Sequence, residues 1–320
     1  MKKSFKIYFL FFSLLIFAHE IHGQKQNKDY ISSQYYQKIA EAELFYLEGK
    51  EKESYQILLE LDSQSYLLNG AITNELYYFL ELSLKNNNYE DAYKSMYKLI
   101  TNYGYKLEDF SYLHNFNKMK KKSDWNILKK ELITLEYLFI SNSIIHNEIK
   151  TMLNDDQYYR EDGYKRIKEF MEKDTTDPYH QNVSLFRFSS YMAKVDSIDN
   201  QNFNRLFKII DSYGFPLSSS LKYTPRERQE VYVGLFVMLV HFSDSTRIDQ
   251  LKPLLLENIR NGNCPPELLA TLVDTYQSRN KEFSIYGTYG KISPEDLSNS
   301  EKLNLRRQKI GLPSYETSKK

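Results

Sequence analysis

Long amphipathic stretches run along this chain, and few helix-breaking residues interrupt them. The 320 residues include only 11 glycines and 8 prolines, and between them apolar side chains recur at the spacing of one helix face. Glycine and proline are the residues least compatible with a helix interior, so their scarcity favours helices almost throughout. The sequence therefore predicts an all-α fold.

The first 23 residues have the three parts of a cleavable secretory signal peptide. Lys2, Lys3 and Lys6 form a positive region, residues 7–18 form an apolar run (IYFLFFSLLIFA), and a polar stretch follows. In a helix that run spans about 18 Å, well short of the ~30 Å hydrocarbon core, so its length fits a signal peptide and not a membrane span. We expect cleavage after Gly23, export to the periplasm or beyond, and no integral membrane segment in the mature chain.

The cysteine content and the charge exclude several classes of protein. Cys264 is the only cysteine, so the chain cannot form an intramolecular disulfide, and no cysteine stands at the cleavage site to carry a lipid anchor. We expect an exported protein that is not a lipoprotein. Its helices must form a hydrophobic core large enough to stabilise the fold without disulfides.

The charges of the chain are nearly balanced. The formal net charge is +1, and the dense basic run at residues 118–122 is typical of a solvated helix face. This balance does not indicate a nucleic acid as partner.

The front half contains two segments that align with each other, residues 39–59 and 76–100. Each reads as an amphipathic helix, a short polar turn and a second amphipathic helix. Small residues such as Ala42 and Ala92 allow the paired helices to cross closely, and larger apolar residues fill the groove between pairs. Four positions match the second helix of the tetratricopeptide pattern: Tyr89, Ala92, Met96 and Leu99.

Residues 24–140 thus resemble a tetratricopeptide-like helical repeat region. The resemblance implies a concave groove that binds a peptide or another protein. Trp125 stands at core spacing with Leu128 and Leu132, which favours a core residue over the alternative, a ligand anchor.

A series of short motifs follows in the back half. In order they are Asp156-Gln157-x-x-Arg160, the turn Gly214-Phe215-Pro216, His241 at the end of an apolar helix, Asp274, Tyr286-Gly287-Thr288, and Asn304 with Arg307. Their order resembles a bacterial family known only as a domain of unknown function, number 6624, over residues 148–316. The resemblance implies a mainly helical C-terminal domain with a polar site, whose candidate residues are Asp156, Gln157, Arg160, His241, Asp274, Tyr286, Asn304 and Arg307.

Two of these side chains can be interpreted without the family. A capping box at Thr224 and Glu227 begins an apolar helix, expected to be apolar all round and central, that ends at His241. The helix dipole stabilises an imidazolium there, so His241 can cap the helix or act as an acid or an anion contact. Asp274 lies at the edge of a core stripe and needs a partner. We consider three arginines for that role: Arg160, Arg306 and Arg307.

The sequence lacks the local spacings that most often carry chemistry. No short His, Cys, Asp or Glu spacing typical of a metal site occurs, nor a phosphate-binding glycine-rich loop, so we expect no metal and no cofactor. Asp196 and Asp199 form a carboxylate pair of the kind common on solvated helix ends. Three functions remain open: a protein- or peptide-binding scaffold in the cell envelope, a small-ligand-binding domain, and an enzyme of unknown reaction with His241 as acid or base and Arg307 as anion clamp.

Overall fold

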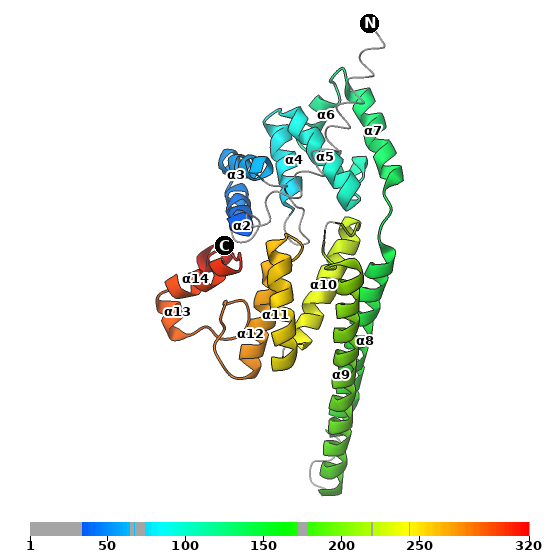
Figure 1. The fold of residues 1–320 in the computed structure, drawn as a ribbon, viewed down its shortest axis with the longest axis vertical. Helices are drawn as coiled ribbons and strands as arrows, with labels where there is room; N and C mark the ends of the chain where they lie inside the picture. The colour runs from blue at the N-terminus through cyan, green and yellow to red at the C-terminus, as the bar shows by residue number, and fades with distance from the viewer. Residues whose placement is uncertain are drawn as a thin grey trace.

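The structure, a computed structural model, describes residues 34–319 except 65–66, 68–73, 172–177, 219 and 243. The expected signal peptide, residues 1–23, lies outside the described residues. Every regular element within the described range is a helix, which confirms the predicted all-α fold (Figure 1). None of these helices is both long enough and apolar enough to cross a membrane.

The front half consists of two helix pairs and a layer beside them. The first pair is α2 (Gln34–Leu47) with α3 (Glu51–Gln64), the second is α4 (Glu75–Lys85) with α5 (Tyr89–Tyr103), and α3 packs against α4. The 3-10 helix η1 (Leu107–Phe110), α6 (Phe116–Met119) and α7 (Trp125–Leu138) follow, and α7 packs along α5. Their apolar side chains form one hydrophobic cluster, to which the buried Trp125 belongs, so its interpretation as a core residue is confirmed.

Local sequence explains where α5 begins and ends. The Asn88 side chain accepts a hydrogen bond from the Asp91 backbone N–H and so caps the first turn. Gly104 ends the helix in the left-handed conformation, at φ 65°. The ring of Phe139 lies so close that a Cβ on Gly104 would stand 2.5 Å from its Cε1. Glycine is therefore required at this position by both the backbone and the packing.

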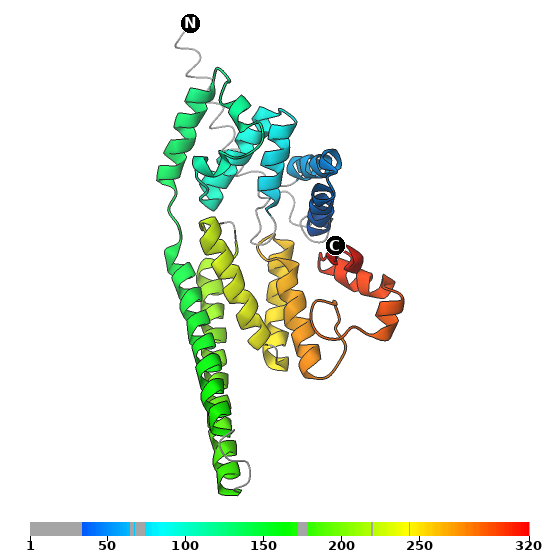
Figure 2. The same ribbon diagram turned by 180° about the vertical axis from the view of Figure 1, so that it is seen from behind.

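The back half begins with a long hairpin of α8 (Ser143–Met171) and α9 (Pro178–Tyr213), whose far end projects from the rest of the protein (Figures 1 and 2). The next helix, α10 (Pro225–His241), packs against α8 and against α12 (Pro266–Arg279), which pairs with α11 (Ser245–Arg260). Three short helices complete the chain: α13 (Pro294–Ser298), α14 (Glu301–Lys309) and α15 (Tyr315–Ser318).

The helix α10 begins as predicted but is less enclosed than expected. The Thr224 hydroxyl accepts from the Glu227 N–H, and the Glu227 carboxylate accepts from the Thr224 N–H at 2.8 Å, which confirms the capping box. The expectation of a helix buried all round is wrong, because Val233 and Phe236 are 45% and 36% exposed. The neighbours α8 and α12 cover only part of the helix, and these two side chains lie on the uncovered part.

The two halves meet through α2, which contacts the end of the back half. Tyr36 packs against the hydrophobic clusters of both halves, and its hydroxyl donates to the Cys264 carbonyl oxygen at 3.1 Å. The last helix, α15, also contacts α2, so the C-terminal segment lies beside the first described helix (Figure 1). The halves therefore share packing and do not form separate bodies joined only by α7 and α8.

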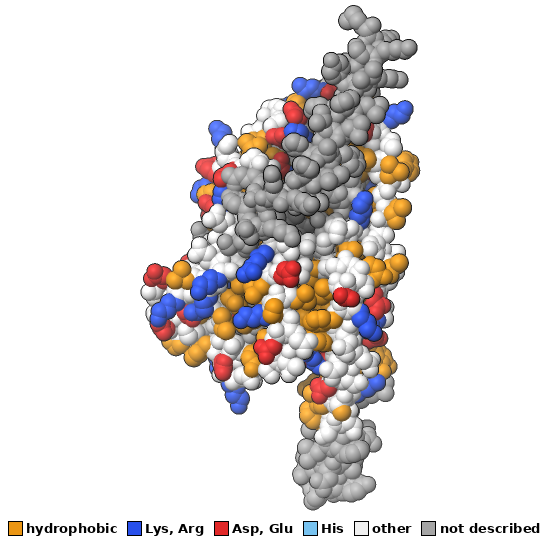
Figure 3. All heavy atoms as spheres, in the orientation of Figure 1, with side chains coloured by type: hydrophobic (Ala, Val, Ile, Leu, Met, Phe, Trp, Pro, Cys, Tyr) orange, Lys and Arg blue, Asp and Glu red, His pale blue; other side chains and the backbone are white. Residues whose placement is uncertain are grey.

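Exposed apolar side chains gather where α7 is followed by α8. Figure 3 shows hydrophobic side chains along the edge of the molecule that these two helices form. We call this group the α7–α8 patch, and its members are Tyr137, Leu138, Ile140 and Ile144.

Candidate functional site

The structure divides the eight predicted site residues between two groups. The first, called the hairpin cluster, lies where α8, α9 and α10 meet and includes Asp156, Gln157, Arg160 and His241. The second, called the loop cluster, surrounds the loop after α12 and includes Asp274, Tyr286, Asn304 and Arg307. Within the described part of the chain, no hydrogen bond or ion pair joins a candidate residue of one group to a candidate residue of the other.

The hairpin cluster is a network of side chains from three helices. Arg160 Nε lies 3.2 Å from Asp156 Oδ1, and Arg160 Nη2 lies 2.5 Å from Asp199 Oδ1. His241 Nδ1 lies 2.8 Å from the same Asp156 oxygen. Gln157 donates through Nε2 to the other Asp156 oxygen at 2.6 Å. Asp156 and Asp199 are only 2% and 5% exposed, so Arg160 compensates two buried carboxylates at once.

Helix geometry brings these groups together. Asp156 and Arg160 are one turn apart on the same face of α8, and Asp199 approaches from α9. His241 occupies the last turn of α10, and its ring contacts Asp156 on α8. The alternative that His241 only caps its own helix is therefore wrong, because its side chain links two helices.

Burial and pairing act in opposite directions on the two carboxyl groups. Burial disfavours ionisation of Asp156, but the hydrogen bond and charge of His241 and the charge of Arg160 outweigh it, so the pKa of Asp156 lies below its usual value. At Asp199 burial outweighs the bond to Arg160, and the pKa is raised. Burial also works against the charge on Arg160, yet its bonds to Asp199 and Asp156 prevail and raise its pKa. Asp156 is thus the more firmly ionised carboxylate of the cluster.

Two kinds of chemistry suit the hairpin cluster. A carboxylate bonded to an imidazole fixes the ring orientation, as in general acid–base sites. The Asp156, Asp199 and His241 side chains also carry atoms that hold metal ions, and one such atom from each lies within 4.8 Å of the other two. Arg160 contacts both carboxylates, so an ion has to compete with its guanidinium.

Asp274 is fully buried and organises the loop that follows α12. Its Oδ1 accepts the backbone N–H groups of Ile285 at 2.8 Å and Tyr286 at 2.9 Å. Its Oδ2 accepts the Thr288 N–H at 2.8 Å and the Thr288 hydroxyl at 2.7 Å. None of the three arginines considered from the sequence bonds to this carboxylate, because the loop turns successive N–H groups toward it and satisfies it without a cation. The geometry gives Asp274 an architectural role.

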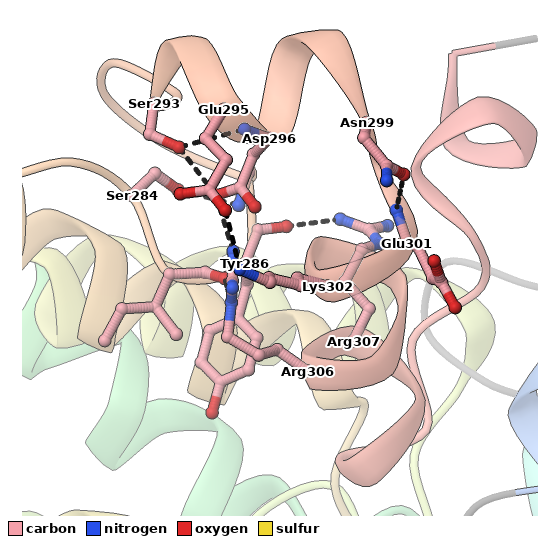
Figure 4. A network of polar contacts seen from close by, with 12 residues as sticks. Ser284, Tyr286, Ser293, Glu295, Asp296, Asn299, Glu301, Lys302, Arg306 and Arg307 are labelled. Atoms are coloured by element: carbon pink, nitrogen blue, oxygen red, sulfur yellow. Dashed lines mark hydrogen bonds and ion pairs between the residues drawn. The ribbon is translucent and has the colours of Figure 1, made fainter.

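Two arginines hold the outer side of this loop (Figure 4). Arg306 donates through Nε to the Ile285 carbonyl oxygen at 2.8 Å and pairs through Nη2 with Asp296 at 2.6 Å. Arg307 donates through Nη1 to the Tyr286 carbonyl oxygen at 2.6 Å. Tyr286 therefore enters the loop cluster through its backbone, while its ring points away from Asp296 (Figure 4). Burial raises the pKa of its phenol.

Asn304 holds the C-terminal segment. Its Nδ2 donates to the Glu316 carboxylate at 2.9 Å, and its Oδ1 accepts the Tyr315 N–H at 2.8 Å. Arg307 also donates to the Ser318 hydroxyl. The loop cluster is thus a set of braces that hold a loop and the C-terminal segment in place.

Asp199 is the cluster residue that the sequence analysis left out of the site. Interpretation as a solvated helix end is wrong for Asp199, which is buried and bonded to Arg160. A signal for it exists in α9, because Asp199 shares a helix face with the buried Asn202, Phe203 and Leu206. A carboxylate on such a face requires a cation or hydrogen-bond donors from another element.

Scans of the chain against protein-family models, curated proteins and solved structures found no match. The tetratricopeptide-like interpretation and the resemblance to the domain of unknown function therefore stay predictions. Function has to be inferred from the described residues themselves.

Proposed function

We propose that the chain is an exported helical-repeat protein that acts as a protein- or peptide-binding scaffold in the cell envelope. The observation that carries the proposal is the α7–α8 patch: Tyr137, Leu138, Ile140 and Ile144 are 85%, 67%, 80% and 70% exposed. Fully burying one large apolar side chain stabilises a protein by about 1.5–3 kcal/mol. A group of large apolar side chains that stays exposed to solvent is typical of an interaction site.

The segment that carries the patch is held in a fixed conformation. Phe139 packs on the end of α5, and the N–H of Asn142 donates to a backbone carbonyl of the back half at 2.7 Å. The Ser141 hydroxyl donates to Glu227 at 2.6 Å. Ile140 lies between these anchors and is exposed. A surface that is already ordered loses little conformational entropy on binding, so this connection suits recognition of a partner.

The polar groups of the back half support a scaffold more than an enzyme. The two alternatives, a small-ligand-binding domain and an enzyme of unknown reaction, use the same candidate residues. In the loop cluster, Asp274 accepts four hydrogen bonds from the chain's own loop. These contacts satisfy the Asp274 carboxylate, which a substrate would otherwise meet.

Site-specific photocrosslinking tests the scaffold proposal. A photoreactive phenylalanine analogue replaces Ile140 in the patch or, as the control, Tyr213, which is 50% exposed at the end of α9. We expect a discrete crosslinked protein from position 140 and none from position 213, with the product lost when Leu138 and Ile144 are both changed to Asp. Equal products from both positions, or none from either in cells that produce the chain, would contradict the proposal.

Export is tested separately. Residues 1–23 are fused to a reporter that is active only outside the cytoplasm, and a second fusion carries Leu10→Arg in the apolar run. We expect activity from the first fusion and little from the second, because a charge in the apolar region of a signal peptide blocks its recognition. Activity from neither fusion would remove the export part of the proposal and leave the patch to be judged alone.

A further inference from the structure

Three side chains of the hairpin cluster converge as metal ligands do. Asp156, Asp199 and His241 come from α8, α9 and α10, and one ligand atom from each lies within 4.8 Å of the other two. A divalent ion about 2.0–2.2 Å from nitrogen and oxygen ligands holds neighbouring ligand atoms about 3–4 Å apart. The three side chains therefore need only a small closing movement to coordinate one ion.

In this structure the Arg160 guanidinium supplies the positive charge that a bound metal ion would supply. Its guanidinium contacts Asp156 at 3.2 Å and Asp199 at 2.5 Å, and these two carboxylate side chains are only 1% and 7% exposed. Two buried carboxylates require positive charge nearby, and Arg160 supplies one unit where a divalent ion supplies two. The Arg160 side chain is itself 24% exposed, so it lies toward the solvent side of the cluster. To make room for the ion, this side chain has to break both ion pairs and turn toward solvent.

We propose that Asp156, Asp199 and His241 bind a divalent transition-metal ion of the Zn²⁺ type, and that Arg160 competes with the ion for both carboxylates. One imidazole and two carboxylates form a mixed nitrogen and oxygen set, which suits such ions better than Mg²⁺ or Ca²⁺. In the metal-free chain the His241 Nδ1 donates its proton to Asp156, so binding at this nitrogen breaks that hydrogen bond and releases the Nδ1 proton to solvent, while Nε2 keeps the one proton of the neutral ring. This site goes beyond the scaffold function and does not depend on the α7–α8 patch.

The surroundings supply the outer contacts that metal ligands need. Gln157 donates to the Asp156 oxygen that His241 and Arg160 do not contact, at 2.6 Å, and so orients this carboxylate. Short spacings in the sequence predict no metal site, whereas 85 positions separate Asp156 from His241. Only the packing of three helices brings the ligands together.

Calorimetric titration of the full, tag-free chain with Zn²⁺ tests the proposal, with Mg²⁺ as the comparison ion. We expect one Zn²⁺ per chain and no detectable Mg²⁺ binding. Arg160→Gln removes the competing cation and leaves the three ligands, so the ion no longer has to break two ion pairs. We expect Zn²⁺ affinity to rise about tenfold or more, which corresponds to about 1.4 kcal/mol or more. His241→Ala removes a ligand and should abolish high-affinity binding.

His146→Ala is the matched control, because His146 is also buried and also joins α8 to α10, through Glu230 at 2.8 Å. It should bind Zn²⁺ as the unchanged chain does. Visible absorption of bound Co²⁺ provides a second readout, since its weak bands in water shift and intensify when protein ligands lower the coordination number. No Zn²⁺ binding by either the unchanged chain or Arg160→Gln, or an equal loss in His146→Ala and His241→Ala, would overturn the proposal.

Discussion

The guanidinium of Arg228, in the back half, stacks on the Tyr103 ring of the front half, with 5.0 Å between its central carbon and the ring centre. The same guanidinium lies 5.7 Å from the Tyr223 ring and donates to the carbonyl oxygens of Leu217 at 2.8 Å and Leu221 at 3.4 Å. Burial lowers the pKa of Arg228, yet a guanidinium stays protonated near neutral pH. One buried cation thus joins α5, α10 and the loop before α10.

Replacing Arg228 should weaken the whole protein. Arg228→Ala leaves two buried carbonyl oxygens without their donor, at about 1–3 kcal/mol each, and removes the packing of the side-chain stem on Tyr103. We expect the free energy of unfolding, measured by urea denaturation, to fall by about 3 kcal/mol. Arg228→Met keeps most of the stem and should recover about 1 kcal/mol of that loss. Identical losses in both variants would show that the stem packing contributes nothing.

Asp274 should be a second residue whose replacement destabilises the protein, because it holds the loop after α12 in place. Asp274→Asn replaces one acceptor oxygen by an NH₂ group that faces N–H donors, so at least one charge-assisted hydrogen bond is lost and a donor meets a donor. We expect a loss of about 3 kcal/mol in urea denaturation and faster hydrogen exchange at the Ile285, Tyr286 and Thr288 amides. Thr288→Val removes only the hydroxyl bond and should cost about 1 kcal/mol. Slow exchange at all three amides in Asp274→Asn would argue against this role.

The helices of this protein could be predicted from sequence because their signals are local. The capping box of Thr224 and Glu227 spans one turn, and Gly104 directly follows the last residue of α5. The all-α class follows from such signals repeated along the chain. Trp125 could also be placed in the core, because its apolar neighbours stand at helical spacing.

The site residues could be identified one at a time but not assembled. Arg160 bonds to Asp199 across 39 positions, and that pairing depends on the register of the α8–α9 hairpin, which no short motif encodes. Asp274 is bonded by backbone N–H groups, which every non-proline residue possesses and which therefore leave no mark in a sequence. The sequence indicates that Asp274 needs a cationic or hydrogen-bonding partner and offers three arginines, whereas in the structure the donors are the N–H groups of a loop.

The acid stability of the protein should depend on Glu227. Burial raises the pKa of this carboxyl, but hydrogen bonds from the Ser141 hydroxyl and from the Thr224 N–H and hydroxyl outweigh burial, so its pKa in the folded chain lies below the usual 4.5. A folded pKa below the unfolded one means that the ionised group stabilises the fold above about pH 4.5 and that this contribution is lost as the pH falls through the folded pKa.

Glu227→Gln should therefore flatten the loss of stability between about pH 5 and the folded pKa, while lowering stability at pH 7. Thermal unfolding followed by circular dichroism at a series of pH values measures both effects. Glu257→Gln, on the exposed face of α11, is the control and should leave the profile unchanged. A Glu227→Gln profile parallel to that of the unchanged chain would contradict the prediction.

The helices α8 and α9 approach each other closely at Gly163. A side chain added there should destabilise the protein when Tyr191 is present and stabilise it when the Tyr191 ring is removed. A Cβ on Gly163 would stand 2.4 Å from Cε2 of Tyr191, whose hydroxyl donates to the Arg160 carbonyl oxygen at 3.3 Å. Gly163→Ala gains about 1 kcal/mol of helix propensity, but forcing the ring aside costs about 1–3 kcal/mol. We expect a net loss of about 1 kcal/mol in urea denaturation and faster hydrogen exchange in the hairpin.

In a Tyr191→Ala background the same substitution meets no ring, so only the propensity gain remains. Gly163→Ala should then stabilise the protein by about 1 kcal/mol, and the double-mutant cycle should give a coupling of about 2 kcal/mol between the two positions. If Gly163→Ala changes the free energy of unfolding equally in both backgrounds, the Tyr191 ring moves aside without an energetic cost. Glycine would then not be required for the spacing of α8 and α9. A coupling of the expected size would instead show that the absence of a side chain at position 163 lets the Tyr191 ring lie against α8.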